Sequence, residues 1–544
     1  MRPLFARQTR KVAPRFTNDQ TGSISVFALT LFLLMAMMGG LAVDMMRHEQ
    51  IRVRLQNTLD RCTLMAASLN QSLDAEPVLR DCVDKDGLTS QLASVAVTQS
   101  ANSRDVVVTG QTPTNPKFLH MMGIKEFDAH AASAANQKIN NIEIVLVLDV
   151  SGSMGGAKLA NLKTAASEFV ATVLAANVDD RVSVAIVPYN AQVNLGVDLR
   201  SKYNAVNLHG VADVNCLEVP ASAYGALALP RTLPLPMMAY ADIAYGTNTV
   251  NAAVSPTDAS FARPNYSNAS CKPTSVNMVR LPSQNVTTLQ AQINGLQAGG
   301  NTSIMLGMKW GVTLLDPGAR TMFSEFVDEG KMPASLNGRP FEYQDEDSLK
   351  IVILMTDGEH VSHRIVNDAY KTGVSPIFKS LSDNNYSIYH ASQPGANKYW
   401  VPHLGVWQAT EWKNAANTGS AVQQSWQQVW ANLKMSYVSW QFYARALGTS
   451  SGTRNTIYNN MNASIQSVFA TVPTMDAQLQ QSCGLAKANN VIVYGIAFEA
   501  PPIGQDQISQ CATSQSHYFN AQGLEISSAF RSIANNITQL KLTQ

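Results

Sequence analysis

The longest hydrophobic pattern in the chain is an uncharged run near its beginning. Residues 22–43 read GSISVFALTLFLLMAMMGGLAV and contain no charged side chain. A helix of this length rises about 30 Å, which matches the hydrocarbon thickness of a bilayer. A cleaved signal peptide has a shorter apolar stretch followed by a small-x-small exit, and Leu41-Ala42-Val43 is a poor exit. We therefore predict a membrane-spanning helix that is retained as an anchor.

A second helical pattern follows directly. Between residues 45 and 73, apolar or small side chains recur at spacings of three and four, namely Ile51, Leu55, Leu59, Cys62 and Ala66. This spacing predicts an amphipathic helix that extends the anchor. We expect residues 44–138 to form a helical stalk or linker.

The remaining chain, 139–544, alternates strand-like and helix-like segments. Apolar, β-branched-rich runs predict buried strands at 142–148, 181–187, 350–355 and 490–498. Three- and four-residue spacings predict helices at 159–173, 287–296, 304–315 and 524–540. This alternation predicts an α/β fold with a doubly wound, mostly parallel sheet.

Two long insertions interrupt this framework, at about 196–284 and 359–482. The first is rich in Pro and Ala and has irregular patterning. The second holds six of the seven tryptophans. Tryptophan dominates binding hot spots, so the second insertion could be a recognition surface. The regular tryptophan spacing favours the other interpretation, which is the hydrophobic core of a small helical subdomain.

Charge excludes one class of partner and orients the membrane helix. The formal net charge is +1, and no Lys/Arg stripe occurs beyond the beginning of the chain, so we expect no nucleic-acid binding. Five basic residues precede the apolar run and three follow it closely. Because positive charge favours the cytoplasmic side, we predict that residues 1–21 are a cytoplasmic basic tail.

The six cysteines form three loosely local pairs without zinc-ligand spacing. The even number favours an oxidising compartment. The simplest pairing joins Cys62 with Cys82, Cys216 with Cys271 and Cys483 with Cys511, among 15 possible connectivities. Six reduced, partly buried thiols are the alternative.

A loop with metal-binding chemistry follows the first predicted strand of the α/β region. Asp149, Ser151 and Ser153 alternate along DVSGSM, where a carboxylate and two hydroxyls can face one cation and glycine permits a tight turn. The loop lies between a strand and a helix, at the edge of an open α/β sheet where ligands bind.

Two further segments supply oxygen ligands. Thr302 lies in the loop GGNTS, and Asp357 follows the buried strand KIVILM in TDG. Three hydroxyls, two carboxylates and water would suit Mg²⁺, which prefers six oxygens and keeps several waters. Mn²⁺ and Ca²⁺ are alternative occupants. One coordination position would remain for an incoming ligand.

DxSxS, then Thr in a GGxT loop, then TDG in that order resembles the metal-ion-dependent adhesion site of von Willebrand factor A domains. The resemblance implies a Rossmann-like fold. It also implies that Ser151, Ser153 and Thr302 bind Mg²⁺ directly, and that Asp149 and Asp357 act largely through water. A carboxylate from a protein partner is then expected at the open position.

In the N-terminal module, Gly22 begins the apolar helix, Asp44 ends it, and the sequences 55–60 (LQNTLD) and 64–67 (LMAA) follow. This arrangement resembles the TadE/TadG-like pilus-assembly proteins of bacterial tight-adherence (Flp pilus) systems. The pilin-like members carry Glu five positions after the glycine, where this chain has Phe27, so we do not expect prepilin-type processing.

These resemblances imply a single-pass protein of the bacterial inner membrane, with residues 44–544 in the periplasm. The expected role is metal-dependent docking of a pilus or envelope protein during assembly. A surface adhesin that binds an external ligand through the same site is the alternative.

Motifs for catalysis are weak. Gly448–Gly452 matches GxSxG but lacks the preceding buried strand of a nucleophile elbow, which favours a flexible loop. His360 and His363 form HxxH without a third zinc ligand, which favours a solvated turn. No GxxxxGK[ST] motif occurs. We expect a binding protein and not an enzyme.

Overall fold

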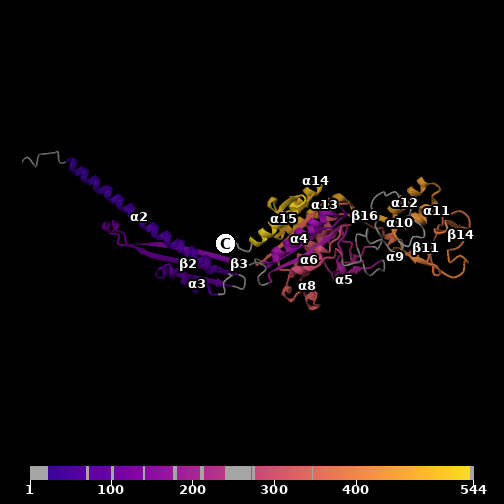
Figure 1. Ribbon diagram of the computed structural model, residues 1–544, viewed down its shortest axis with the longest axis horizontal. Helices are drawn as coiled ribbons and strands as arrows, with labels where there is room; N and C mark the ends of the chain where they lie inside the picture. The colour runs from indigo at the N-terminus through magenta and orange to yellow at the C-terminus, as the bar shows by residue number, and fades with distance from the viewer. Residues whose placement is uncertain are drawn as a thin grey trace, which may run out of the picture. The chain divides into compact units, whose positions relative to one another are not determined.

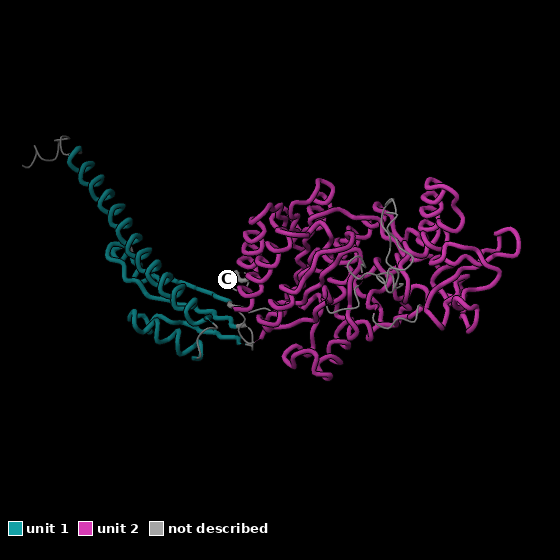
Figure 2. Tube along the Cα trace, turned by 45° about the vertical axis from the view of Figure 1, so that its right-hand side comes forward, with its two compact units in different colours: residues 1–139, 541–544 teal, residues 140–540 magenta. Residues whose placement is uncertain are grey.

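The computed structural model divides the chain into two compact units (Figure 2). Unit 1 comprises Met1–Ile139 with Lys541–Gln544, and unit 2 comprises Asn140–Leu540. The structure describes residues 23–68, 73–99, 103–138, 141–175, 180–208, 214–238, 271, 276–345 and 347–539. The predicted cytoplasmic tail, 1–21, lies outside these residues.

Unit 1 begins with a single long helix, α2 (Ser23–Ala67), so the predicted anchor and its amphipathic extension are continuous. Most large apolar side chains between Ile24 and Val43 are exposed. Among the described helices, α2 is the one long and apolar enough to cross a membrane. The first half of α2 therefore has the exposed apolar surface that a bilayer would cover.

The second half of α2 packs on a three-stranded antiparallel sheet (Figure 1). The sheet has the order β1 (Leu92–Gln99), β2 (Ser103–Thr114) and β3 (Phe127–Lys138). Leu55 and Leu59 are buried with Val106 and Val108, which alternate along β2 as the period of a strand requires.

A short helix, α3 (Ala75–Lys85), also packs against α2. The expectation of a helical stalk over 44–138 is therefore wrong beyond α3. Residues 92–99, 103–114 and 127–138 form strands instead, and alternate valines of β2, Val106 and Val108, are buried on its one covered face.

Unit 2 is built on a six-stranded sheet with the order β18-β17-β9-β4-β5-β8. Its strands are β4 (Asn141–Asp149), β5 (Val182–Tyr189), β8 (Arg280–Ser283), β9 (Ser348–Thr356), β17 (Val491–Phe498) and β18 (Tyr518–Ala521). Every pairing is parallel except that of β8 with β5, which is antiparallel. The four predicted strand segments all belong to this sheet.

Helices cover both faces of this sheet, because alternate residues of β4 point into two separate cores. Leu146 and Leu148 pack in the core that includes α4 (Ala157–Ala175), α6 (Val286–Asn294) and α15 (Glu525–Gln539). Val145 and Val147 pack in the core that includes α7 (Ile304–Leu315), α13 (Val472–Ala488) and α14 (Pro502–Cys511). The continuous apolar runs reflect burial on both faces.

The strand order reverses direction at the centre of the sheet. From β4 the chain first adds β5 on one side, and later adds β9, β17 and β18 on the other. The loops after β4 and β9 therefore diverge at their carboxyl ends. In open α/β sheets, such a reversal is where ligands bind.

The prediction of a mostly parallel sheet holds for this sheet and not for the whole chain. The described residues also contain the antiparallel sheet of unit 1, an antiparallel pair of β10 (His363–Val366) with β16 (Gln466–Ala470), and a five-stranded antiparallel sheet. These strands are short or contain polar residues, so the sequence does not show the two-residue alternation that predicts a strand.

The first insertion is largely irregular where it is described. It contains α5 (Gly196–Ser201), the two-residue strands β6 (Ala205–Val206) and β7 (Leu235–Pro236), and the 3-10 helix Ala221–Gly225. The predicted end of this insertion, at about residue 284, is too late. Residues Arg280–Ser283 form β8, which is an edge strand of the central sheet. The helix α8 (Arg320–Asp328) follows α7 farther along the chain.

The second insertion contains the five-stranded sheet, with the order β14-β13-β12-β11-β15. Its strands are β11 (Val374–Ser380), β12 (Tyr386–Tyr389), β13 (Tyr399–Val401), β14 (Val406–Gln408) and β15 (Ala421–Ser425). Its helices are α9 (Trp426–Asn432), α10 (Met435–Tyr437), α11 (Arg445–Leu447), α12 (Ser451–Ile465) and the π-helix Val438–Ala444.

Five of the six tryptophans of this insertion are buried, and Trp407 is partly buried. Trp400, Trp426 and Trp430 are buried in one cluster, and Trp426 stacks on Trp430 with ring centroids 5.3 Å apart. The core interpretation is therefore confirmed. The helical interpretation is incomplete, because Trp400 pairs with Trp407 across neighbouring strands.

The predicted disulfide pairing is confirmed. Cys62 bonds Cys82, Cys216 bonds Cys271, and Cys483 bonds Cys511. The first bond joins α2 to α3, and the third joins α13 to α14. All six cysteines are paired, so the alternative of six reduced thiols is wrong.

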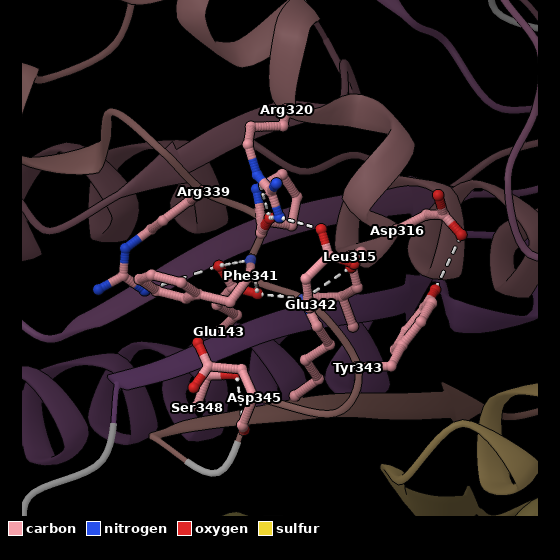
Figure 3. A network of polar contacts seen from close by, with 12 residues as sticks. Glu143, Leu315, Asp316, Arg320, Arg339, Phe341, Glu342, Tyr343, Asp345 and Ser348 are labelled. Atoms are coloured by element: carbon pink, nitrogen blue, oxygen red, sulfur yellow. Dashed lines mark hydrogen bonds and ion pairs between the residues drawn. The ribbon is translucent and has the colours of Figure 1, made fainter.

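A buried ionic network lies where β4 and β9 begin (Figure 3). Glu143 and Lys350 are register partners on these strands, and Lys350 Nζ lies 2.5 Å from Glu143 Oε2. The Phe341 N–H donates to Glu143, and Lys350 also donates to the Leu315 carbonyl at 2.9 Å. Buried charges require such partners. The charged groups at this end of the sheet are thus satisfied within the protein.

Candidate functional site

The predicted metal ligands gather at the carboxyl ends of β4 and β9. Asp149 is the last residue of β4, and Asp357 directly follows β9. Ser151 and Ser153 belong to the turn before α4, and Thr302 lies just before α7. The structure therefore brings together residues from three loops at the reversal of strand order.

Asp149 is fully buried and organises the first loop. Its Oδ1 accepts the Ser151 N–H at 2.8 Å, and its Oδ2 accepts the Thr356 hydroxyl at 2.7 Å. Burial and the nearby Asp357 carboxylate raise the pKa of Asp149 to about 6, although these hydrogen bonds oppose the rise. The two neighbouring carboxylates repel each other when both are charged, so a cation bound beside them would stabilise their charged forms.

Three oxygens converge beside Asp149. Ser153 Oγ donates to Asp357 Oδ1 at 2.7 Å, and Ser151 Oγ lies 3.0 Å from Ser153 Oγ and 3.5 Å from the same carboxylate oxygen. Ser153 is exposed, whereas Ser151 and Asp357 are buried. The cluster is therefore anchored in the protein and open to solvent on one side.

Thr302 lies close to this cluster, beside Gly358. A Cβ at Gly358 would lie 3.5 Å from Thr302 Oγ1 and 4.0 Å from Ser153 Oγ. The Thr302 loop is fixed by backbone hydrogen bonds, from Gly152 N–H to Gly300 O at 2.8 Å and from Val361 N–H to Thr302 O at 3.0 Å. All three loops are thus tied to one another.

The donor set is chemically suited to a hard cation. It consists of three hydroxyls and two carboxylates, and oxygen ligands are those that Mg²⁺ and Ca²⁺ prefer. Among the described residues, no group of three or more His, Cys, Asp or Glu side chains could hold a metal ion. The set depends instead on hydroxyls, and the residues present fit Mg²⁺ better than Zn²⁺.

Two charged residues at this site were missed from the sequence. Lys158 Nζ lies 2.8 Å from Asp357 Oδ2 and 3.7 Å from Glu499 Oε2. Lys158 is on the first turn of α4, directly after the DxSxS loop. This short spacing was the sequence feature that could have indicated a position near the site. Glu499 follows β17 with a positive φ of 52°, and no local pattern connects it to the loop.

The two histidines of HxxH do not share a site. His360 Nε2 accepts the Met305 N–H at 2.9 Å, and its Nδ1 lies 2.7 Å from Asp476 Oδ1. His363 Nε2 pairs with the Gln192 amide at 2.7 Å. Both histidines are buried, so the prediction of a solvated turn is wrong.

The GxSxG segment is a helix cap. Ser450 Oγ accepts the Thr453 N–H at 3.2 Å and forms a capping box at the beginning of α12. The expectation of a flexible loop is therefore wrong. Asp476 and His517 follow Ser450 in the chain order of a hydrolase triad, but they pair with His360 and Ser514 instead.

Comparison with known proteins supports a relation to pilus systems. Residues 22–69 match the family model described as "Putative Flp pilus-assembly TadE/G-like", which confirms the resemblance of the N-terminal module. No curated protein matches the sequence.

Solved structures that resemble the chain include pilus proteins. The vWF domain of the type V pili tip protein Mfa5 from Porphyromonas gingivalis has 13% identity and a TM-score of 0.30, covering 75% of this chain and 97% of that one. The pilus adhesin SpaC from Lactobacillus rhamnosus GG has 11% identity and a TM-score of 0.28, covering 82% and 33%. The pilus adhesin RrgA from Streptococcus pneumoniae has 10% identity and a TM-score of 0.27, covering 81% and 49%. The chain thus spans about a third of SpaC and half of RrgA.

Proposed function

We propose that this chain is a membrane-anchored, non-enzymatic component of Flp pilus assembly that docks a protein partner at a Mg²⁺ site. The match of residues 22–69 supports the pilus-assembly role. The apolar first half of α2 supports the anchor. The excess of basic residues before this helix favours a cytoplasmic N-terminus and a periplasmic unit 2.

The proposed fold of unit 2 is a doubly wound domain of the von Willebrand factor A type. Its support is the parallel central sheet, the helices on both faces and the reversal of strand order between β4 and β9. The two insertions then extend from this domain.

The observation that carries the proposal is the convergence of Ser151, Ser153 and Asp357 within 2.7–3.5 Å at the reversal point. In the proposed site these residues, with Thr302 and Asp149, hold the cation directly or through water. When bound, Mg²⁺ would supply a position that accepts a carboxylate oxygen from the partner.

Residues of the chain prepare this position before any partner arrives. Asp149 holds the Ser151 backbone and the Thr356 hydroxyl, so the loop does not have to be ordered during binding. Exposure of Ser153 leaves the approach open. Because no residue of the set is left over as a general base, the arrangement favours binding over catalysis.

Quantitative cross-linking in membranes with Mg²⁺ tests this proposal. We would compare the native chain, Asp149→Ala, and the control Asp328→Ala, which alters an exposed carboxylate at the end of α8. Each variant would be checked for folding by circular dichroism. Selective loss of pilus or secretion proteins with Asp149→Ala is expected.

Identical partners for all three chains would overturn docking at this site. A deletion strain complemented with Asp149→Ala separates the two roles of the site. Missing pili would support assembly, whereas intact pili with lost adherence would overturn assembly in favour of a surface adhesin.

A further inference from the structure

A second apolar surface lies in unit 1, on the loop between β2 and β3. This β2–β3 loop comprises residues 115–126 and contains the 3-10 helix Leu119–Met122. Three of its large apolar side chains are exposed: Met121 by 84%, Phe118 by 44% and Ile124 by 43%. Lys117 and Lys125 flank them and are also exposed. Apolar tips with lysines beside them are typical of surfaces that enter a lipid interface.

The loop is attached to α2 at the end of the apolar run. Asp44 Oδ1 accepts the Lys117 N–H at 2.8 Å, and Asp44 Oδ2 accepts the N–H groups of Phe118 and Leu119 at 2.6 and 2.8 Å. One carboxylate thus satisfies three backbone donors, including those at the start of the 3-10 helix. Asp44 is only 3% exposed in this arrangement.

Both strands that lead into the loop are fixed at His48, one helical turn beyond Asp44. His48 Nδ1 lies 3.1 Å from Thr114 Oγ1 at the end of β2. The His48 ring packs on Phe127 at the start of β3, with ring centroids 4.3 Å apart. The loop is therefore held along α2 from both of its ends.

Gly40 fixes the position of Phe118. A Cβ at Gly40 would lie 2.4 and 2.5 Å from two Phe118 ring atoms and 2.8 Å from Phe118 Cβ, so only glycine admits this side chain at this turn of α2. A Cβ at the neighbouring Gly39 would meet nothing within 4 Å. Phe118 therefore extends from Asp44 back toward the apolar run.

These contacts place the loop at the boundary of the membrane. From Ile24 to Asp44 a helix rises about 30 Å, so Asp44 lies at the edge of the hydrocarbon if residues 22–43 span it. Phe118, at the level of Gly40, then lies one turn deeper, where it would meet lipid. The Lys117 backbone is bonded to Asp44, so the Lys117 side chain begins at the level where headgroup phosphates would lie.

We propose that the β2–β3 loop inserts Phe118, Met121 and Ile124 into the bilayer that α2 spans, on the side that carries the sheet of unit 1. This inference rests on the membrane anchor of the proposed function. The insertion fixes the depth of α2 and the orientation of the sheet at the lipid surface, because the loop is bonded to the helix and cannot tilt independently.

Site-specific fluorescence tests this proposal on the full chain. All native cysteines are in disulfides, so Met121→Cys adds one reactive thiol for an environment-sensitive label. Ser90→Cys is the control. Ser90 is exposed and follows Asp86 closely in the sequence. Asp86 pairs with Arg61, in the second half of α2, away from the apolar run. Both variants would be reconstituted in vesicles of phosphatidylcholine and phosphatidylglycerol.

We expect severalfold less quenching by aqueous iodide at position 121 than at position 90. A shallow nitroxide lipid should quench position 121 selectively. Gly40→Leu should make position 121 accessible to iodide, because it displaces Phe118 while keeping the helix apolar. Gly39→Leu should leave it protected.

Vesicle flotation separates failure of this inference from failure of the anchor. If the chain floats with the vesicles and position 121 is as accessible as position 90, loop insertion is overturned and the anchor stands. If the chain does not float, the anchor is overturned, and the inference falls with it.

Discussion

Lys158 and Ser153 each contact a different oxygen of the Asp357 carboxylate. Lys158 Nζ lies 2.8 Å from Asp357 Oδ2, and Ser153 donates to Asp357 Oδ1 at 2.7 Å. The side chain of Asp357 is fully buried, whereas that of Lys158 is 24% exposed. The proposed cation site therefore has the Lys158 ammonium group beside it, which limits how strongly it attracts Mg²⁺.

Replacing this lysine should strengthen Mg²⁺ binding. We expect Lys158→Met to lower the Mg²⁺ dissociation constant about tenfold, which corresponds to about 1.4 kcal/mol, because repulsion between two cations is removed. Isothermal titration calorimetry of the full chain in detergent measures the change. Lys163→Met, on the same helix, is the control. Weaker binding in Lys158→Met would mean that the lysine is needed to hold Asp357 in place.

Mg²⁺ should stabilise the native chain and not Asp149→Asn. At a concentration 100 times its dissociation constant, a bound ligand adds about 2.7 kcal/mol to the free energy of unfolding. Asparagine removes the buried charge of Asp149 and should cost little without metal, because the raised pKa shows that this charge is unfavourable above pH 6. Thermal unfolding with Mg²⁺ and with EDTA tests this. Equal stabilisation of both chains would contradict the site.

Two glycines in helices should respond oppositely to alanine. A Cβ at Gly307, in α7, would lie 2.5 Å from the buried Tyr189 ring, so Gly307→Ala should destabilise unit 2 by about 1–3 kcal/mol. A Cβ at Gly484, in α13, meets nothing within 4 Å, so Gly484→Ala should stabilise by up to about 1 kcal/mol. Urea unfolding measures both. Equal effects would show that α7 does not pack this closely on β5.

Acid should destabilise unit 2 through His363. Burial lowers the pKa of His363 to about 4 from an ordinary value of 6.5. As pH falls from 6.5 to 4, the unfolded chain binds this proton first, so stability should decrease by about 3 kcal/mol. In His363→Gln this part of the pH dependence should disappear. Parallel stability curves for the two chains, measured by urea unfolding from pH 7 to pH 4, would refute it.

The sequence was most informative where one kind of residue fills a segment. The run before Asp149 and the run before Thr356 are apolar at nearly every position because both faces of the sheet are covered. Segments with one covered face were misjudged. The strands β1 to β3 and the strands around Trp400 mix polar and apolar side chains, and their pairing depends on neighbours distant in the chain.

The residues of the candidate site also differ in how far the sequence alone identified them. Asp149, Ser151 and Ser153 were found together because one loop contains them. Thr302 and Asp357 were found through their own loops, since glycine and a preceding strand mark each one. Lys158 was missed because its role depends on a carboxylate about 200 residues away.

By itself, the sequence determined the local chemistry: an uncharged run long enough to cross a bilayer, strands buried on both faces, and loops that present oxygens. Only the tertiary structure decided which loops meet. The order of the strands brings Asp357 to Ser153, and the packing of α2 brings Asp44 to the β2–β3 loop. Hydrophobic patterning fixes which face of a strand is buried, but it does not specify which other strand lies beside it.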